Sequence, residues 1–383
     1  MHRAYYNYYY LLINNNIRNH MKLQVTQENL SKAVSTVGRV ANTRNTLPIL
    51  SNIMLKTVGT RLAISATNLE IGITHYIGSK VGEKGSITVP ARLMQDFVSS
   101  LPSGVIDLTL DEYKLHITTD KYNSVINGVS AEEFPVMPTI EGGEKWSLPS
   151  HVLKRGLQQI LIAASNDEAR PVLTGVYMQT NDGKLFAAAT DSYRLAEKNL
   201  GKTTEKVNLL IPASSLQDLL RILPEGEELV EITNDDQQIL FKVGEVELVT
   251  RLIEGVYPDY QKLIPKTFAN TAKISKTDLV NITKVSSLFA RESAGSVTVQ
   301  LDDTQKQISI RAVASQLGEN TATADAEVVG DGGITLNSKY ILDALAVMSS
   351  DTVELCFNGK LEPCVLRESD KNDYTHVIMP LKS

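Results

Sequence analysis

Apolar residues recur at the helical period in three pairs of segments along the chain. In the later member of each pair they fall at i, i+3, i+4 and i+7, which places them on one face of a helix. Each pair therefore predicts two amphipathic helices. The apolar positions are Leu30, Ala33, Val34 and Val37 with Met94, Phe97, Val98 and Leu101; Leu153, Leu157 and Ile160 with Leu216, Leu219, Leu220 and Leu223; Leu279 and Ile282 with Ile341, Ala344, Leu345 and Met348.

Short segments between and after these helices alternate apolar and polar residues, as half-buried antiparallel strands do. The alternation predicts sheets with one buried and one solvated face. Two helices packed on antiparallel sheets make each unit an α+β domain. The strand segments are 62–67, 185–190 and 308–313, with 106–110, 230–233 and 353–357.

One domain is present three times. The segment Val89–Asp96 returns as Ile211–Asp218 and, more faintly, as Leu336–Asp343, at intervals of just over 120 residues. A repeat of this length is a whole domain rather than a solenoid unit. We expect domains at 21–146, 147–270 and 271–383. We also expect Pro90 and Pro212 in the first turns of their helices and Ser150 and Ser275 as helix caps;.

Residues 1–20 differ from the rest in being dominated by tyrosine and asparagine. They contain no signal-sequence pattern, so we interpret them as a disordered leader or a mis-annotated start, with Met21 as the true start and a membrane-touching aromatic segment as the alternative;. Cys356 and Cys364 are the only cysteines, which favours a reducing cytoplasm;. The formal charge of −6 argues against a nucleic-acid partner unless basic residues are gathered locally;.

Catalytic chemistry is not indicated. The chain has no Walker-type phosphate loop, no nucleophile elbow, and no histidine or cysteine spacing typical of a metal site;. Asp191 and the pair Asp235-Asp236 are the best acidic candidates, but both occupy positions expected of turns;. We therefore expect a protein without catalytic activity, cofactor or metal.

Five motifs resemble the bacterial DNA polymerase III beta subunit family, the replicative sliding clamps, in the same order and spacing from Met21 to the C-terminus. They are Thr46–Leu50, Val89–Arg92, Ala189–Ala196, Tyr257–Tyr260 with Ile264-Pro265, and Val377–Leu381.

The resemblance implies a head-to-tail homodimer that closes a ring of six similar domains around double-stranded DNA. Helices would line the hole and sheets would form the outside. The protein would be a processivity factor, the non-catalytic subunit of the DNA polymerase III holoenzyme. Its implied partners are the polymerase catalytic subunit, the clamp loader complex, and other proteins with a clamp-binding motif, namely repair polymerases, ligase and mismatch repair proteins.

Basic residues in or beside the predicted helices could contact phosphates without reading sequence. The alternative is that they lie on ordinary solvated helix faces. The resemblance favours DNA contact and adds Arg44. The set is Arg44, Lys32, Arg39, Arg92, Lys154, Arg155, Arg221, Lys276, Lys284 and Lys339.

The resemblance also implies a groove for partner peptides between the second and third domains. Apolar pockets with a polar rim suit leucine- and phenylalanine-type anchors. For Leu173 and Val377 taken alone, completion of domain cores is the favoured interpretation, because buried aliphatic residues usually belong to a core. The implied groove residues are Leu173, Thr190, Ser192, Tyr193, Arg194, Leu195, Pro258, Lys262, Leu263, Asn337, Tyr340, Pro363, Val377, Met379 and Leu381.

For the dimer contact, the family positions correspond to Ile126 on an edge of the first domain and Leu288-Phe289 on the third. An exposed edge strand invites pairing with another chain. Burial inside each domain is the alternative. A non-catalytic scaffold of three like domains that does not encircle DNA is the alternative function.

Overall fold

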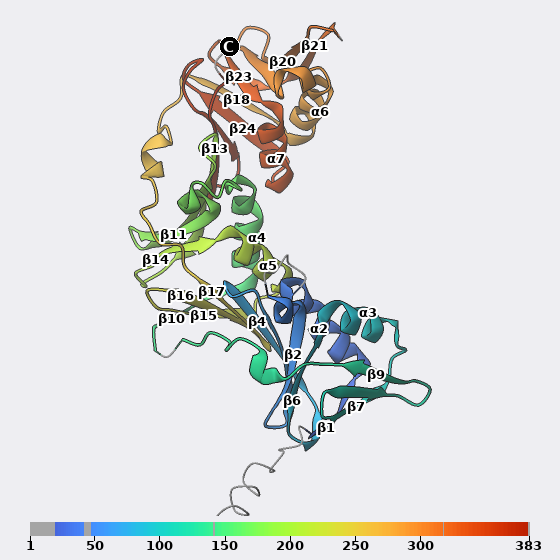
Figure 1. Ribbon diagram of the computed structural model, residues 1–383. Coiled ribbons are helices and arrows are strands. Elements are labelled where there is room, and N and C mark those ends of the chain that lie inside the picture. Colours follow the sequence, from blue (N-terminus) through green and yellow to red (C-terminus); the bar gives the residue numbers. More distant parts are fainter. Residues whose placement is uncertain (1–19, 42–46, 141, 317, 382–383) are drawn as a thin grey trace, which may run out of the picture. The chain divides into compact units, whose positions relative to one another are not determined.

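A computed structural model describes residues 20–41, 47–140, 142–316 and 318–381. The chain folds into two compact units (Figure 1). The first contains the residues up to Lys145 together with Val230–Thr250, and the second contains Trp146–Leu229 and Arg251 onward. Arg44 and the leader before His20 lie outside the described residues.

The first repeat pairs α2 with α3 and packs α2 on β2, β3 and β4. Its elements are β1 (His20–Thr26), α2 (Gln27–Ala41), the 3-10 helix η1 (Pro48–Ser51), β2 (Asn52–Val58), β3 (Arg61–Thr67), β4 (Ile71–Gly78), β5 (Lys80–Glu83), β6 (Ser86–Pro90), α3 (Ala91–Ser100), β7 (Val105–Asp111), β8 (Lys114–Thr118), β9 (Asn123–Asn127) and η2 (Ala131–Glu133).

The middle repeat has a similar order, with one strand fewer between its helices, and pairs α4 with α5, with α4 against β12 and β13. Its elements are β10 (Glu144–Pro149), α4 (Ser150–Ile160), η3 (Leu161–Ala163), η4 (Pro171–Thr174), β11 (Gly175–Asn181), β12 (Lys184–Thr190), β13 (Arg194–Lys202), β14 (Asn208–Pro212), α5 (Ala213–Ile222), β15 (Leu229–Asn234), β16 (Gln238–Val243), β17 (Val246–Arg251) and η5 (Tyr260–Leu263).

The third repeat pairs α6 with α7, with α6 against β20 and β21. Its elements are β18 (Asn270–Ser275), α6 (Lys276–Ser287), η6 (Arg291–Ser293), β19 (Ser296–Asp302), β20 (Gln307–Ala314), β21 (Gly318–Asp325), β22 (Glu327–Val329), β23 (Gly332–Asn337), α7 (Ser338–Val347), β24 (Thr352–Phe357), β25 (Cys364–Glu368) and β26 (Tyr374–Ile378). The predicted α+β class is confirmed.

The strands form sheets that continue from one repeat into the next. An eight-stranded sheet has the order β10-β15-β16-β17-β4-β3-β2-β6, and a nine-stranded sheet has the order β14-β11-β12-β13-β26-β25-β24-β18-β22. Two smaller sheets, β5-β1-β7-β8-β9 and β21-β20-β19-β23, complete the first and third repeats. Each larger sheet thus joins two repeats, at β17–β4 in the first unit and at β13–β26 in the second.

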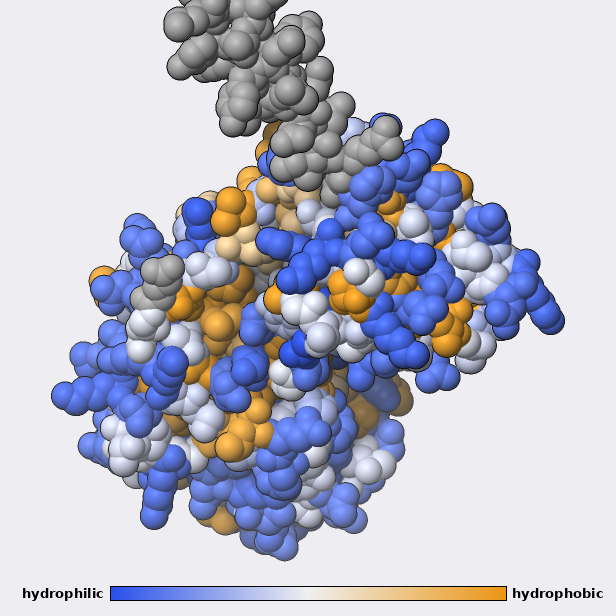
Figure 2. Space-filling view, turned by 90° about the horizontal axis from the view of Figure 1, so that it is seen from below, coloured by the Kyte–Doolittle hydropathy of each residue, from blue (hydrophilic) through white to orange (hydrophobic). Residues whose placement is uncertain are grey.

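The predicted apolar stripes face the core. Leu30, Leu153 and Leu279 are all fully buried, as are Met94, Leu216 and Ile341 on the second helix of each repeat. Elsewhere the apolar side chains that reach the surface are scattered among hydrophilic ones, as on the face shown in Figure 2. Helical periodicity therefore located the core face of each helix correctly.

Helix starts were predicted less well. Ser275 caps α6 as expected, because its side chain accepts a hydrogen bond from Asp278 N. The prediction for Ser150 was wrong: the cap residue is Pro149, and the Ser150 hydroxyl donates instead to Pro224 O. Pro90 and Pro212 stand one residue earlier than expected, at the cap position, where a fixed φ near −57° suits the entering strand;.

Candidate functional site

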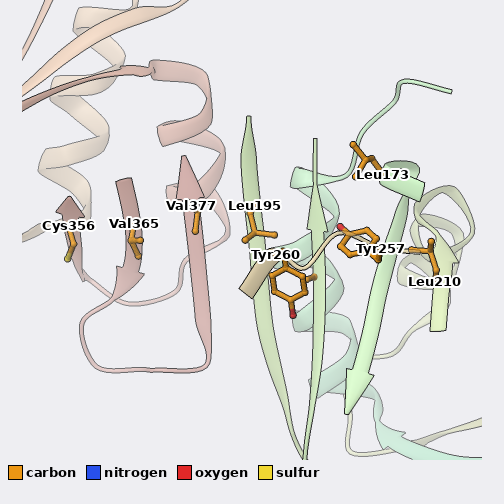
Figure 3. Close-up of a cluster of buried hydrophobic side chains, with 9 residues drawn as sticks. Leu173, Leu195, Leu210, Tyr257, Tyr260, Cys356, Val365 and Val377 are labelled. Carbon is orange, nitrogen blue, oxygen red and sulfur yellow. The ribbon is translucent and has the colours of Figure 1, made fainter. Parts of the chain in front are cut away.

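A row of side chains crosses the nine-stranded sheet where the middle and third repeats meet. Leu195 on β13 lies opposite Val377 on β26, which lies opposite Val365 on β25, which lies opposite Cys356 on β24. Figure 3 shows these four side chains side by side on consecutive strands. Because side chains alternate across a strand, residues paired in this way share one face of the sheet.

The linker between the two repeats covers this row. Tyr257 stacks on Tyr177 of β11 with ring centroids 5.0 Å apart, and Tyr260 meets Tyr257 edge-on at 6.2 Å. The Tyr260 hydroxyl accepts a hydrogen bond from Gln179 Nε2 at 3.0 Å. The resulting seam cluster consists of Leu173, Ala188, Leu195, Leu210, Tyr257, Tyr260, Cys356, Val365 and Val377 (Figure 3).

Three of the residues predicted for the groove belong to this seam cluster. Leu173, Leu195 and Val377 are 5%, 3% and 1% exposed. They come from three different elements of two repeats, so they complete a shared core between the repeats rather than the core of either one. Tyr257 and Tyr260 were missed as site residues, although both stand in the motif Tyr257–Tyr260.

A tight turn carries the rim residues Ser192 and Tyr193 to the surface. Asp191 Oδ1 accepts hydrogen bonds from the backbone N–H groups of Tyr193 and Arg194, and Thr190 Oγ1 donates to Arg194 O. Ser192 adopts a left-handed backbone with φ +77°. The predicted turn role of Asp191 is confirmed. Asp235 has the same role at the β15–β16 hairpin, where it accepts from the N–H groups of Gln237 and Gln238.

Arg194 points away from Leu195, toward α7, because consecutive strand residues face opposite sides. Its guanidinium lies 4.5 Å from the centre of the Tyr340 ring. It also contacts Asp191 Oδ2 at 3.1 Å and Asp343 Oδ2 at 2.6 Å. We call Arg194, Tyr340, Asp191 and Asp343 the arginine platform.

Burial and neighbouring charges shift the pKa values of Asp343 and Tyr340 in the platform. Burial opposes ionisation of Asp343, but hydrogen bonds from Lys339 and Arg194 outweigh it and lower the pKa of this carboxyl. Burial, together with the negative charge of Asp191, raises the pKa of the Tyr340 hydroxyl. Asp343 is therefore a carboxylate at neutral pH, beside the neutral Tyr340 phenol;.

The chain's last described residues run past the turn. Met379 N donates to Tyr193 O at 2.9 Å, and Leu381 N donates to Thr335 O at 2.8 Å. Asn337 caps α7 by accepting from Lys339 N. The sequence-predicted residues of this side are therefore gathered at the ends of β13, β23 and β26.

The remaining predicted groove residues lie on loops at the surface. Pro258 is exposed, and Lys262 forms a 2.7 Å ion pair with Asp259. Leu263 is exposed and Pro363 is half-buried just before β25. No hydrogen bond or ion pair links these four side chains to the arginine platform among the described residues.

Arg170 is a rim residue that sequence reasoning missed. Its guanidinium donates to Ser192 Oγ at 3.0 Å and to Asp167 Oδ2 at 3.1 Å. The signal was present, because Arg170-Pro171 stands where Leu47-Pro48 stands in the first repeat. A cation before the same proline distinguishes the two copies.

Many of the basic residues predicted to contact DNA have acidic or carbonyl partners within the chain. Lys32, Arg39 and Lys284 are exposed and form no ion pair within the described ranges. The partners of the others are Glu225 for Lys154 (2.6 Å), Glu368 for Arg155 (3.5 Å), Asp218 for Arg221 (2.6 Å), Asp343 for Lys339 (2.6 Å), Asp96 for Arg92 (3.9 Å) and Met348 O for Lys276 (2.9 Å).

The residues predicted for a dimer contact lie on or near free sheet edges. Strands β9 and β21 are the end strands of their sheets. Ile126 on β9 is buried, and its neighbour Val125 is half exposed. Leu288, after α6, is also half exposed, and Phe289 is partly buried. The side chain of Ile126 thus packs in its own repeat, while the strand edge stays open.

Metal-binding clusters and membrane-spanning helices are both absent from the part of the chain that the structure describes. No cluster of three or more histidine, cysteine, aspartate or glutamate residues is arranged to hold a metal ion there. None of the helices there is long and apolar enough to cross a membrane.

Known proteins resemble this chain along nearly all of its length. Family models described as DNA polymerase III beta subunit, N-terminal, central and C-terminal domain, match residues 21–138, 147–259 and 261–382. The beta sliding clamp of Synechocystis sp. is 32% identical, with 94% of this chain and 99% of that protein covered. The beta sliding clamp of Staphylococcus aureus is 31% identical, with 89% and 93% covered.

Solved structures of sliding clamps also resemble this chain. The DNA polymerase sliding clamp of Bacillus subtilis superposes with a TM-score of 0.90 at 28% identity, covering 95% of this chain and all of that one. A sliding clamp of Pseudomonas aeruginosa bound to griselimycin gives 0.89 at 26% identity, with the same coverage. The chain therefore belongs to the bacterial DNA polymerase III beta subunit family, the DNA sliding clamps.

Proposed function

We propose that this sliding clamp acts without catalysis, as a homodimeric ring that encircles duplex DNA in the cytoplasm and tethers the replicative polymerase. The observation that carries the proposal is the end-to-end match with beta sliding clamps. The match with the Synechocystis protein covers 99% of that protein's length. Three copies per chain and two chains give six domains, enough to close a ring.

Ring closure is supported by two open sheet edges. Strand β9 ends one sheet of the first unit and β21 ends one sheet of the second. An open edge is a template for pairing with another chain. Two different edges joining head to tail close a ring when the rotation allows it.

DNA contact falls mainly to Lys32, Arg39 and Lys284, whose charges are not neutralised within the described chain. Phosphate contacts of this kind position a protein without reading sequence, and salt weakens them strongly. Three cations per chain give little affinity at physiological salt. Topology, rather than affinity, then keeps the ring on DNA.

Loading on nicked circular DNA followed by linearisation tests this proposal. A ring slides off once the circle is cut, so the wild-type clamp should be lost from linear DNA and kept on circles. The control is V125D, which places a charge on the half-exposed β9 edge and should leave the clamp unable to stay on either form. Retention of wild type on the linear form would point to direct binding by a non-encircling scaffold.

Partner binding is assigned to the seam between the middle and third repeats. The buried seam cluster gives this site an apolar base, the tail Met379–Leu381 adds apolar side chains at its edge, and the arginine platform supplies polar groups on the opposite face of β13. Such a pocket suits short peptides with apolar anchors. The polymerase catalytic subunit, the clamp loader, repair polymerases, ligase and mismatch repair proteins would compete for it.

A deletion of Met379–Ser383 tests the groove. Removing these residues eliminates the hydrogen bonds from Met379 N and Leu381 N, so the affinity for a leucine- and phenylalanine-anchored peptide should fall below detection. Dimerisation, measured by sedimentation, should persist because the deleted residues belong to neither β9 nor β21. The control is a shorter deletion of residues 382 and 383. Equal peptide affinity in the longer deletion and wild type contradicts the proposal.

A further inference from the structure

An aspartate stands at the same position of the second helix in all three repeats, as Asp96, Asp218 and Asp343. In the first repeat its carboxylate is exposed and 3.9 Å from Arg92, one turn earlier on the same helix. In the middle repeat it pairs with Arg221, three residues later on the same helix, at 2.6 Å. Exposed ion pairs of this kind within a helix contribute little to stability.

The third aspartate differs because it also reaches another repeat. Asp343 Oδ2 lies 2.6 Å from an Nη atom of Arg194, on β13 of the middle repeat. The Arg194 side chain is 10% exposed, so this pair is largely shielded from water. The first repeat has Ile71 in the place of Arg194, and an isoleucine cannot form such a pair.

The ion pair between Asp343 and Arg194 restrains a side chain of the candidate site, whereas the pairs of Asp96 and Asp218 only link residues of one helix. With Asp191 on its Nε side and Asp343 on its Nη side, the guanidinium of Arg194 is fastened from two directions. Its central carbon then lies over the ring of Tyr340, which stands one helical turn before Asp343. A guanidinium that is held in place loses little further freedom when a ligand binds, which favours affinity.

We propose that Asp343 is a positioning residue of the partner-binding groove, which holds Arg194 against Tyr340 and so presets the rim that a partner peptide meets. The proposal rests on the groove assigned above. Asp343 acts through Arg194 and need not touch the peptide itself. Its second partner, Lys339, is 70% exposed, so the i, i+4 pair on the surface of α7 contributes little;.

The test measures binding of a fluorescein-labelled peptide with one leucine and one phenylalanine anchor by anisotropy, on the full-length clamp. D343N keeps the shape of the side chain but removes its charge, and should weaken binding at least tenfold. D343E should recover most of the affinity, because a carboxylate again reaches Arg194. D96N, the matched change at the exposed repeat position, and K339A should bind within twofold of wild type.

A double-mutant cycle separates positioning from general stability. If Asp343 acts through Arg194, R194A/D343N should bind no more weakly than R194A alone. Losses that multiply in the double variant, or D343N affinity equal to wild type, overturn the inference. Loss of affinity in D343E as large as in D343N also overturns it. If wild type itself fails to bind the probe, the groove assignment falls, and this inference falls with it.

Discussion

Replacing the buried His376 with leucine should make the second unit less sensitive to acid. His376 lies on β26, opposite Ala196 on one side and Leu366 on the other, and is fully buried. Its Nδ1 is 3.0 Å from the Tyr374 hydroxyl, and its Nε2 has no hydrogen-bond partner in the described structure. Burial, reinforced by the charge of Arg194 and opposed by that of Asp343, lowers its pKa to about 3.

The size of the effect follows from proton linkage. A histidine in the unfolded chain titrates near pH 6.5. Between pH 6.5 and about pH 3, His376 is therefore protonated in the unfolded chain but neutral in the folded chain. The free energy of unfolding falls as the pH falls through this range;. From pH 7 to pH 5 the loss from this one residue amounts to about 2 kcal/mol.

The window from pH 7 to pH 5 isolates the histidine from the buried carboxylate nearby. Burial acts to raise the pKa of Glu368, but hydrogen bonds from the Ser349 hydroxyl and the backbone N–H groups of Ser349 and Ser350 lower it to about 2. Its contribution to stability therefore begins to fade only below about pH 4.5, the ordinary range of a glutamate. His75 in the first unit also has a lowered pKa, about 4, so the comparison is between variant and wild type.

Urea unfolding followed by far-ultraviolet circular dichroism at pH 7, 6 and 5 provides the measurement. Leucine is the chosen substitute because Leu248 occupies the corresponding place in the first unit. Y374F is the control: it removes hydrogen bonds to His376 and to Gln159 O, so it should lower stability equally at every pH and keep the wild-type slope. A wild-type slope in H376L would refute the reasoning.

Three further outcomes follow from the packing. L195A should lower the free energy of unfolding by about 2–5 kcal/mol, because Leu195 is buried in the seam cluster, whereas L263A at a half-exposed position should change it by less than about 0.5 kcal/mol; equal losses in urea unfolding would contradict the cluster;. L69G should raise stability by about 1 kcal/mol, because Leu69 is half exposed with φ +79°, and an unchanged or lower melting temperature would argue against backbone strain there;. Replacing Lys284 with glutamine should reduce the salt dependence of DNA binding, while the same change at ion-paired Lys154 should reduce it less; equal slopes in a salt titration would count against the assignment;.

Periodicity predicted the helices well because each repeat buries one stripe per helix, as the helix over Leu30–Val37 shows. The expected solvated face was found on β7, but it was wrong for the strand over Leu62–Thr67, where every residue is buried and both faces are therefore covered. Side-chain hydrogen bonding at helix starts was less predictable. Ser150 and Ser275 occupy similar positions in the sequence, but only Ser275 caps its helix. The Ser150 hydroxyl instead donates a hydrogen bond to Pro224 O, which is distant in the sequence.

The sequence predicted many residues of the candidate site, but it did not predict the ion pairs and ring contacts that these residues make. Arg194 and Tyr340 were named from the family motif, yet their stacking depends on Asp343, which lies 149 residues from Arg194 in the chain. The ion pair between Lys154 and Glu225 was hidden for the same reason. Charge pairs between distant segments depend on which strands meet, and local patterns carry no information about that.

The two seams between repeats show that side chains, rather than backbone, make the groove. The turns Thr67–Ile71 and Thr190–Arg194 have the same threonine-to-carbonyl hydrogen bond, and each has a left-handed third residue. At the first seam, however, Gly72 replaces Leu195 and a methionine, Met137, fills the space above the glycine. Ile71 and Leu248 stand where Arg194 and His376 stand at the second seam. The same backbone thus supports an apolar joint at one seam and a charged, partly open one at the other, so a partner site can arise there without any change of fold.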